Sequence, residues 1–169
     1  MMHSRKGQVY VFVAILLIAF AFSVTRPHSA SESKKDAFTE LYENFERESP
    51  VVVNSALREN LNVSAEFAAF AVNYFDYART KSPKFRFLYI LRDNDALLVG
   101  NRLGLSVNAS FSGASYNVSD GAILTATPGD LTIDVEGLDY SFSIGPEPYQ
   151  VRSIFRQQVG RERRVYVSG

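Results

Sequence analysis

The hydrophobic pattern of the chain changes its period near residue 84, and this change limits the fold more than any other feature. Before it, apolar side chains recur every three to four residues, as they do on one face of a helix. After it, apolar residues stand at alternate positions, as in Phe85, Phe87 and Tyr89, which is typical of strands. Helices followed by a run of strands leave no crossover helix for parallel pairing, so the sequence predicts an α+β fold with antiparallel strands.

Residues 32–80 are predicted to be helical, in three segments. The first follows Ser33, which stands in a pattern that resembles a capping box. Pro50 suits the first turn of a helix, so a second helix is expected over residues 51–60. A third is expected after Ser64 as its cap, and its apolar stripe, the strongest helical period in the chain, is interpreted as core packing. The stripe consists of Phe67, Phe70, Ala71, Tyr74, Phe75 and Ala78.

Residues 84–169 are predicted to be rich in β-structure, with seven to nine short strands. Turn sequences divide them, among them Asp93-Asn94-Asp95 and Pro128-Gly129-Asp130. Residues 149–167 are predicted to form a closing hairpin. Short strands with turns about every 8 to 12 residues indicate a meandering antiparallel sheet or a sandwich.

An uncharged apolar run from Val9 to Val24 follows a short basic leader. Eleven of its sixteen residues are Val, Ile, Leu or Phe, and together they favour membrane insertion by about 3 to 7 kcal/mol. A helix over residues 8–25 would be about 27 Å long, which is nearly the thickness of a bilayer core. We therefore expect a single-pass protein of the cell membrane with an extracytoplasmic C-terminal part. Its predicted divisions are the basic leader 1–7, the transmembrane helix 8–25, a hinge 26–31 and an exported domain 32–169.

The junction Arg5-Lys6-Gly7-Gln8, with the apolar run beginning at the next residue, resembles the class III signal of type IV pilins, and Gln after Gly is similar to archaeal members. The resemblance is limited to the first 25 residues or so. It implies that a prepilin peptidase cuts between Gly7 and Gln8 and that the retained helix becomes the assembly element of a surface filament. Phe12 stands where bacterial members carry Glu. Pro27 falls where filament pilins usually continue one long helix.

Two other interpretations of this segment stay open. An uncleaved anchor fits its composition, and Ala19-Phe20-Ala21 could serve as the exit of a removable secretory signal, although it lies inside the apolar run. The leading predicted function is a structural subunit or minor component of a type IV pilus-like filament, as a homo- or hetero-oligomer. The alternative is a membrane-tethered extracytoplasmic binding domain that does not polymerise.

Residue types that carry catalysis are scarce. The chain has no Cys, and its two histidines, His3 and His28, lie in the leader and the hinge. Since nucleophile-elbow, phosphate-loop and zinc-helix motifs are missing too, we expect no enzymatic activity, no cofactor and no metal site. Three sequons are candidate N-glycosylation sites, and the last two fall on the polar side of the strand alternation. They begin at Asn62, Asn108 and Asn117.

The formal net charge is zero, but the charges are unevenly distributed. Residues 103–151 contain six acids and no Lys or Arg, whereas residues 152–169 contain five arginines and one Glu. The candidate interaction patch consists of Arg152, Arg156, Arg161, Arg163 and Arg164. These arginines could pair with an acidic strand of the same chain, steer a neighbouring subunit, or capture an anionic surface or DNA. Zero net charge makes a nucleic-acid partner the least favoured of these.

Overall fold

The computed structural model describes residues 36–111, 113–160 and 162–168. The predicted leader 1–7, transmembrane helix 8–25, hinge 26–31 and cleavage junction at Gly7 and Gln8 lie outside this part of the chain. Within it, no helix is both long and apolar enough to cross a membrane.

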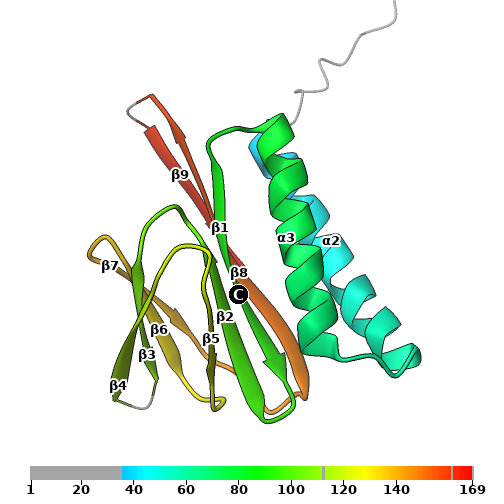
Figure 1. The fold of residues 1–169 in the computed structure, drawn as a ribbon. Coiled ribbons are helices and arrows are strands. Elements are labelled where there is room, and N and C mark those ends of the chain that lie inside the picture. The colour runs from blue at the N-terminus through cyan, green and yellow to red at the C-terminus, as the bar shows by residue number, and fades with distance from the viewer. Residues whose placement is uncertain (1–35, 112, 161, 169) are drawn as a thin grey trace, which may run out of the picture. The chain divides into compact units, whose positions relative to one another are not determined.

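Within the described residues two helices precede the strands, as Figure 1 shows. They are α2 (Ala37–Arg58) and α3 (Val63–Lys81). The strands are β1 (Phe85–Asp93), β2 (Ala96–Arg102), β3 (Val107–Phe111), β4 (Ala114–Val118), β5 (Ile123–Ala126), β6 (Leu131–Val135), β7 (Leu138–Phe142), β8 (Tyr149–Val159) and β9 (Glu162–Val167).

The strands form two antiparallel sheets. Sheet A has the order β5-β2-β1-β8-β9, and sheet B has the order β4-β3-β6-β7. The long central pair of sheet A, β1 and β8, runs in register from Asp93 opposite Tyr149 to Phe85 opposite Gln157. The predicted α+β class and the antiparallel pairing are thus confirmed.

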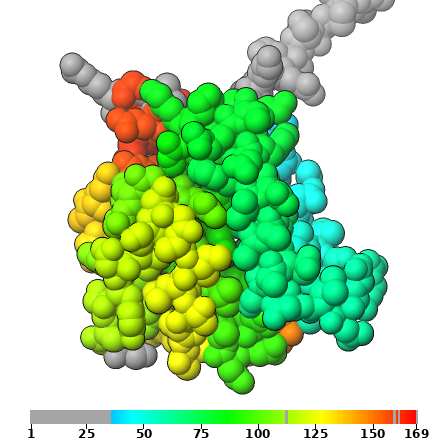
Figure 2. All heavy atoms as spheres, viewed as in Figure 1, coloured from blue at the N-terminus to red at the C-terminus, as the bar shows by residue number. Residues whose placement is uncertain are grey.

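Sheet A is buried on both faces. Phe85, Phe87 and Tyr89 of β1 join the apolar cluster beneath α2 and α3, whereas Leu88 and Ile90 join the cluster shared with sheet B. Successive side chains of a strand point to opposite faces, so β1 serves both cores. The result is a sandwich with a helical layer on the outer face of sheet A. In Figure 2 the helices (cyan to green) and strands β3 and β4 of sheet B (yellow-green) lie on opposite sides.

The prediction that Pro50 begins a separate helix is wrong. Helix α2 continues through it from Ala37 to Arg58. A proline inside a helix has no N–H for the carbonyl four residues back, here that of Glu46, and costs roughly 3 kcal/mol. Phe45 and Val53, on either side of Pro50, are both buried in the cluster against sheet A. This shared packing holds the two halves in one helix.

The prediction that Ser64 caps α3 is also wrong. Asn62 is the N-cap, and its side-chain oxygen accepts a hydrogen bond from the Ala65 N–H at 2.8 Å. Ser64 instead donates from its N–H and its hydroxyl to Oδ2 of Asp93, at 3.1 and 2.5 Å. Because Asp93 ends β1, this carboxylate joins the β1–β2 turn to the first turn of α3, where a negative charge is favourable.

The buried hydroxyl of Tyr74 joins the two helices. It donates a hydrogen bond to the backbone carbonyl of Leu41 in α2, and burial raises the pKa of Tyr74 above its ordinary range. A folded-state pKa above that of the unfolded chain gives stability that is complete below about pH 10 and is lost as the pH rises towards the folded-state pKa.

We therefore expect Tyr74→Phe to lower the free energy of unfolding by about 1 kcal/mol near pH 8, because the hydrogen bond is lost. The variant should also lose less stability than the wild type when the pH is raised to about 10.5. Urea unfolding at the two pH values measures both effects. Tyr77→Phe, at an exposed position one turn along α3, serves as the control and should keep the wild-type pH dependence. An unchanged dependence in Tyr74→Phe would contradict the assignment.

Candidate functional site

Sheet A has an open edge on the first half of β8. Strand β9 is shorter than β8 and pairs only with its second half, from Ile154 to Val159. Just before Ile154, Ser153 exchanges hydrogen bonds with Ser168, the residue after β9. Backbone groups of alternate residues point to the same side of a strand, so the N–H and C=O groups of Val151 face the same way as those of Ser153. In the described part of the chain no strand lies beside them.

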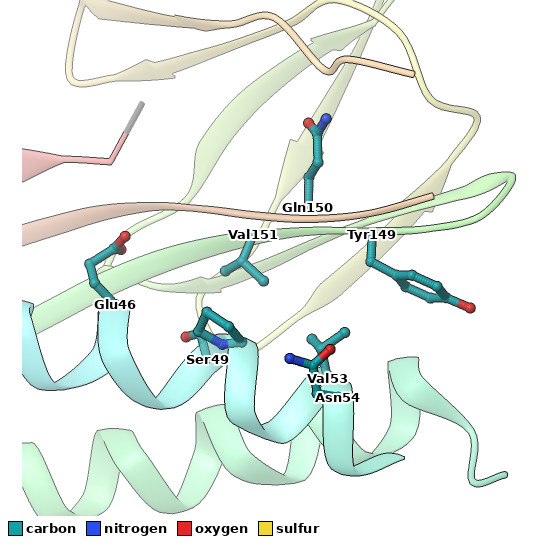
Figure 3. A pocket seen from close by; sticks show the side chains of 8 residues that line it. Glu46, Ser49, Val53, Asn54, Tyr149, Gln150 and Val151 are labelled. Atoms are coloured by element: carbon teal, nitrogen blue, oxygen red, sulfur yellow. The ribbon is translucent and has the colours of Figure 1, made fainter. Parts of the chain in front are cut away.

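A hollow of about 220 Å³ lies between this edge and α2, and we call it the edge groove. Its lining comes from α2 around Pro50 and from the start of β8: Glu46, Ser49, Pro50, Val53, Asn54, Tyr149, Gln150 and Val151. Figure 3 shows Val151 pointing towards α2 and Gln150 pointing away from it. The groove therefore has an apolar wall beside a strand edge.

Two polar groups of α2 in the groove lack their usual partners. The Ser49 hydroxyl is buried, with 2% of the residue exposed, and has no hydrogen-bond partner among the described residues. The carbonyl of Glu46 loses its usual helical donor because residue 50 is proline. Buried polar groups are normally satisfied, so the Ser49 hydroxyl is a group that a ligand or water would bind.

A chain of side-chain hydrogen bonds joins Glu46, which lines the edge groove, to β8. The hydroxyl of Ser153 donates to Oε1 of Glu46 at 2.9 Å and lies 3.0 Å from the hydroxyl of Ser168. Ser153 is fully buried. These contacts connect α2, β8 and the end of β9, so they fix the distance between the helix and the open strand edge.

The size and chemistry of the edge groove suit an extended peptide. Its volume is below the roughly 300 to 1,000 Å³ of pockets that hold drug-sized ligands, so it has room for one or two side chains. The exposed backbone of an edge strand pairs with another extended chain, and alternate side chains of that chain would enter the hollow.

The structure brings two arginines of the predicted interaction patch together at one acidic side chain. Arg156 and Arg163 both bind Oε2 of Glu136, at 2.8 and 3.1 Å. Arg164 forms an ion pair with Asp36, the residue before α2. Arg152 lies on β8 opposite Ile90. Arg161 falls outside the described residues.

Pairing within the chain is therefore part of the explanation for the uneven charge. Glu136 belongs to the acidic stretch and lies in the β6–β7 turn of sheet B. Its ion pair with Arg156 of β8 therefore joins the two sheets, whereas a pair between neighbouring strands of one sheet was expected. Other acids of this stretch bind backbone N–H groups in turns. Asp120 accepts from Gly104 and Asp134 accepts from Gly137, both at 2.8 Å.

The three sequon asparagines are exposed. Asn62 caps α3, as described above. Asn108 and Asn117 stand directly opposite each other on β3 and β4, and Nδ2 of Asn117 donates to Oδ1 of Asn108 at 3.1 Å. Since the Cβ atoms of such cross-strand pairs are only about 5 Å apart, glycans on both residues would compete for the same space.

The edge groove was not predicted from the sequence, although two features of the chain mark its place. One is a proline inside a continuous apolar stripe, since Phe45 and Val53 both face the core. The other is the closing hairpin, whose arms of 11 and 6 residues leave part of the longer strand unpaired.

The described residues contain no group of three or more His, Cys, Asp or Glu side chains placed to hold a metal ion. Comparison with known proteins assigns no family either: no family model, no curated protein and no solved structure matches this chain.

Proposed function

We propose that the chain is a structural subunit or minor component of a type IV pilus-like surface filament and has no catalytic role. The observation that carries the proposal is the junction Arg5-Lys6-Gly7-Gln8 directly before an uncharged apolar run. A basic leader that ends in Gly is what a prepilin peptidase needs to release the leader and leave the apolar helix on the product. That helix would hold the subunit in the membrane and then in the filament, with residues 32–169 displayed outside the cell.

The described residues support a displayed role. They form an α+β body with two apolar clusters, one under the helices and one between the sheets, as a head domain requires. The edge groove adds a surface where one protein can contact another through backbone hydrogen bonds.

The mass of the native protein tests the proposal. We expect a chain that begins at Gln8, because the leader is removed and the apolar run is kept. Gly7→Val should block the cut and leave a chain that begins at Met1, whereas the neighbouring change Ser4→Ala should be processed normally. A wild-type chain that begins at Met1 would indicate an uncleaved anchor, and one that begins beyond Ala21 would indicate a removed signal. Either result would exclude pilin-like processing.

A second candidate function is a membrane-tethered binding domain that never polymerises. The edge groove favours it, because the unpartnered Ser49 hydroxyl beside an open strand edge suits capture of an extended peptide. Pro27, where a filament pilin usually continues its helix, points the same way. Electron microscopy of cells with and without the gene separates the two functions, since only a filament component changes the surface filaments when it is deleted.

A further inference from the structure

A second hollow, of about 400 Å³, carries three cationic side chains, and we call it the cationic hollow. It lies on the face of sheet A that is turned towards sheet B, and no acid is among its lining residues. These are Lys84, Arg86, Leu103, Gly104, Leu105, Arg156 and Gln158. Lys84 and Arg86 lie outside the arginine patch that the sequence predicts.

Strand pairing brings these cations together. Arg86 of β1 stands directly opposite Arg156 of β8, and Phe85 stands opposite Gln157, so Lys84 and Gln158 are neighbours at the next position. Like charges that face each other across two strands destabilise a sheet. An anion bound between them would remove this repulsion.

The two arginines are held in place. The guanidinium of Arg86 donates to the carbonyl of Phe85 at 2.7 Å, and its Nε lies over Gly104, where an added Cβ would be 2.8 Å away. Arg156 has only 14% of its side chain exposed and is oriented by Glu136. Guanidinium groups that are fixed in this way lose little conformational freedom when they bind an oxyanion.

The charge around the hollow stays positive after the nearby acids are counted. Lys84, Arg86, Arg156 and Arg163 contribute four positive charges, while Glu136 and Asp120 contribute two negative ones. Glu136 is shared by Arg156 and Arg163, and Asp120 accepts from the Gly104 N–H. Lys84 has no ion pair or hydrogen bond with any described residue. Two positive charges therefore remain available to a dianion.

We propose that the cationic hollow binds the phosphate or sulfate group of a small ester. The charges of Lys84, Arg86 and Arg156 suit a tetrahedral dianion, because hydrogen bonds from guanidinium and ammonium groups to an oxyanion are strengthened by the opposite charges. The hollow is larger than the ion itself, and Leu103 and Leu105 give it an apolar wall, which leaves room for the molecule that carries the group.

Calorimetric titration of the full chain in a dilute chloride buffer tests the proposal, with inorganic phosphate, sulfate, glucose 6-phosphate and glucose 6-sulfate as probes. We expect saturable binding in the millimolar range or tighter.

Arg86→Gln should weaken this binding by about tenfold or more, since hydrogen bonds between charged groups are lost. Lys84→Gln changes only an exposed side chain, so it keeps the test valid if the arginine variant folds poorly. Arg58→Gln, at the far end of α2 with 79% of its side chain exposed, is the matched control and should bind as the wild type does.

The probes also distinguish the sources of the anion. Esters that bind at least as well as the inorganic ions support the proposal in full. Binding of the inorganic ions alone would overturn the assignment to an ester. Absence of saturable binding, or an equal loss in Arg58→Gln, would overturn the site. None of these outcomes depends on the cut at Gly7, so the site and the filament proposal are tested separately.

Discussion

Phe45→Ala is expected to lower the free energy of unfolding by about 3 to 5 kcal/mol, which is a large part of the stability of a domain of this size. Phe45 is fully buried where α2, α3 and sheet A meet. Its ring centroid lies within 5.2 to 6.2 Å of five other aromatic rings, those of Phe67, Phe70, Tyr74, Phe87 and Phe155. The loss combines the transfer free energy of the ring with the cost of the cavity, because rings from three elements cannot all move inward.

Urea unfolding followed by circular dichroism measures this effect. Tyr77→Ala is the control, since it removes an aromatic ring of similar size from an exposed position of α3 and should cost less than about 1 kcal/mol. A similar cost in both variants would mean that Phe45 is not the centre of the cluster.

Most of the fold followed from the change of period near residue 84. Alternation identified the strands because each inner residue is buried, as in Val107, Ala109 and Phe111 of β3. The wrong predictions concern helix starts, where tertiary packing overrides the local sequence preference. Pro50 marks a helix start in isolation, yet the core on both sides of it keeps α2 continuous. Ser64 suits a cap, yet Asp93 binds it and Asn62 takes that position.

The surfaces could not be predicted in the same way. The edge groove depends on where β9 stops beside β8, and strand ends are the least marked part of an alternating pattern. The cationic hollow depends on pairing between β1 and β8, which brings Arg86 opposite Arg156 although they are far apart in the sequence. The arginine-rich end of the chain was visible, but its partners Glu136 and Asp36 come from different elements.

Gly100→Ala is expected to destabilise the protein by about 1 to 3 kcal/mol, although a glycine inside a strand is ordinarily a weakness that alanine improves. Gly100 of β2 stands directly opposite Tyr89 of β1, and the Tyr89 ring lies across it, in the place that a Cβ would occupy. Tyr89 is only 2% exposed and its ring also packs against those of Phe67 and Phe87. The ring therefore has no free space into which it can move.

If the Tyr89 ring causes the destabilisation by Gly100→Ala, removal of this ring should reverse the sign of the effect. Tyr89→Leu alone should destabilise the protein through lost packing, but in that background Gly100→Ala should be neutral or stabilising, since the methyl group enters space that the ring has left. Urea unfolding of the wild type, the two single variants and the double variant gives the coupling free energy between the two positions. A cost of Gly100→Ala that stays the same without the ring would show that the backbone of β2, and not the contact with Tyr89, requires glycine at this position.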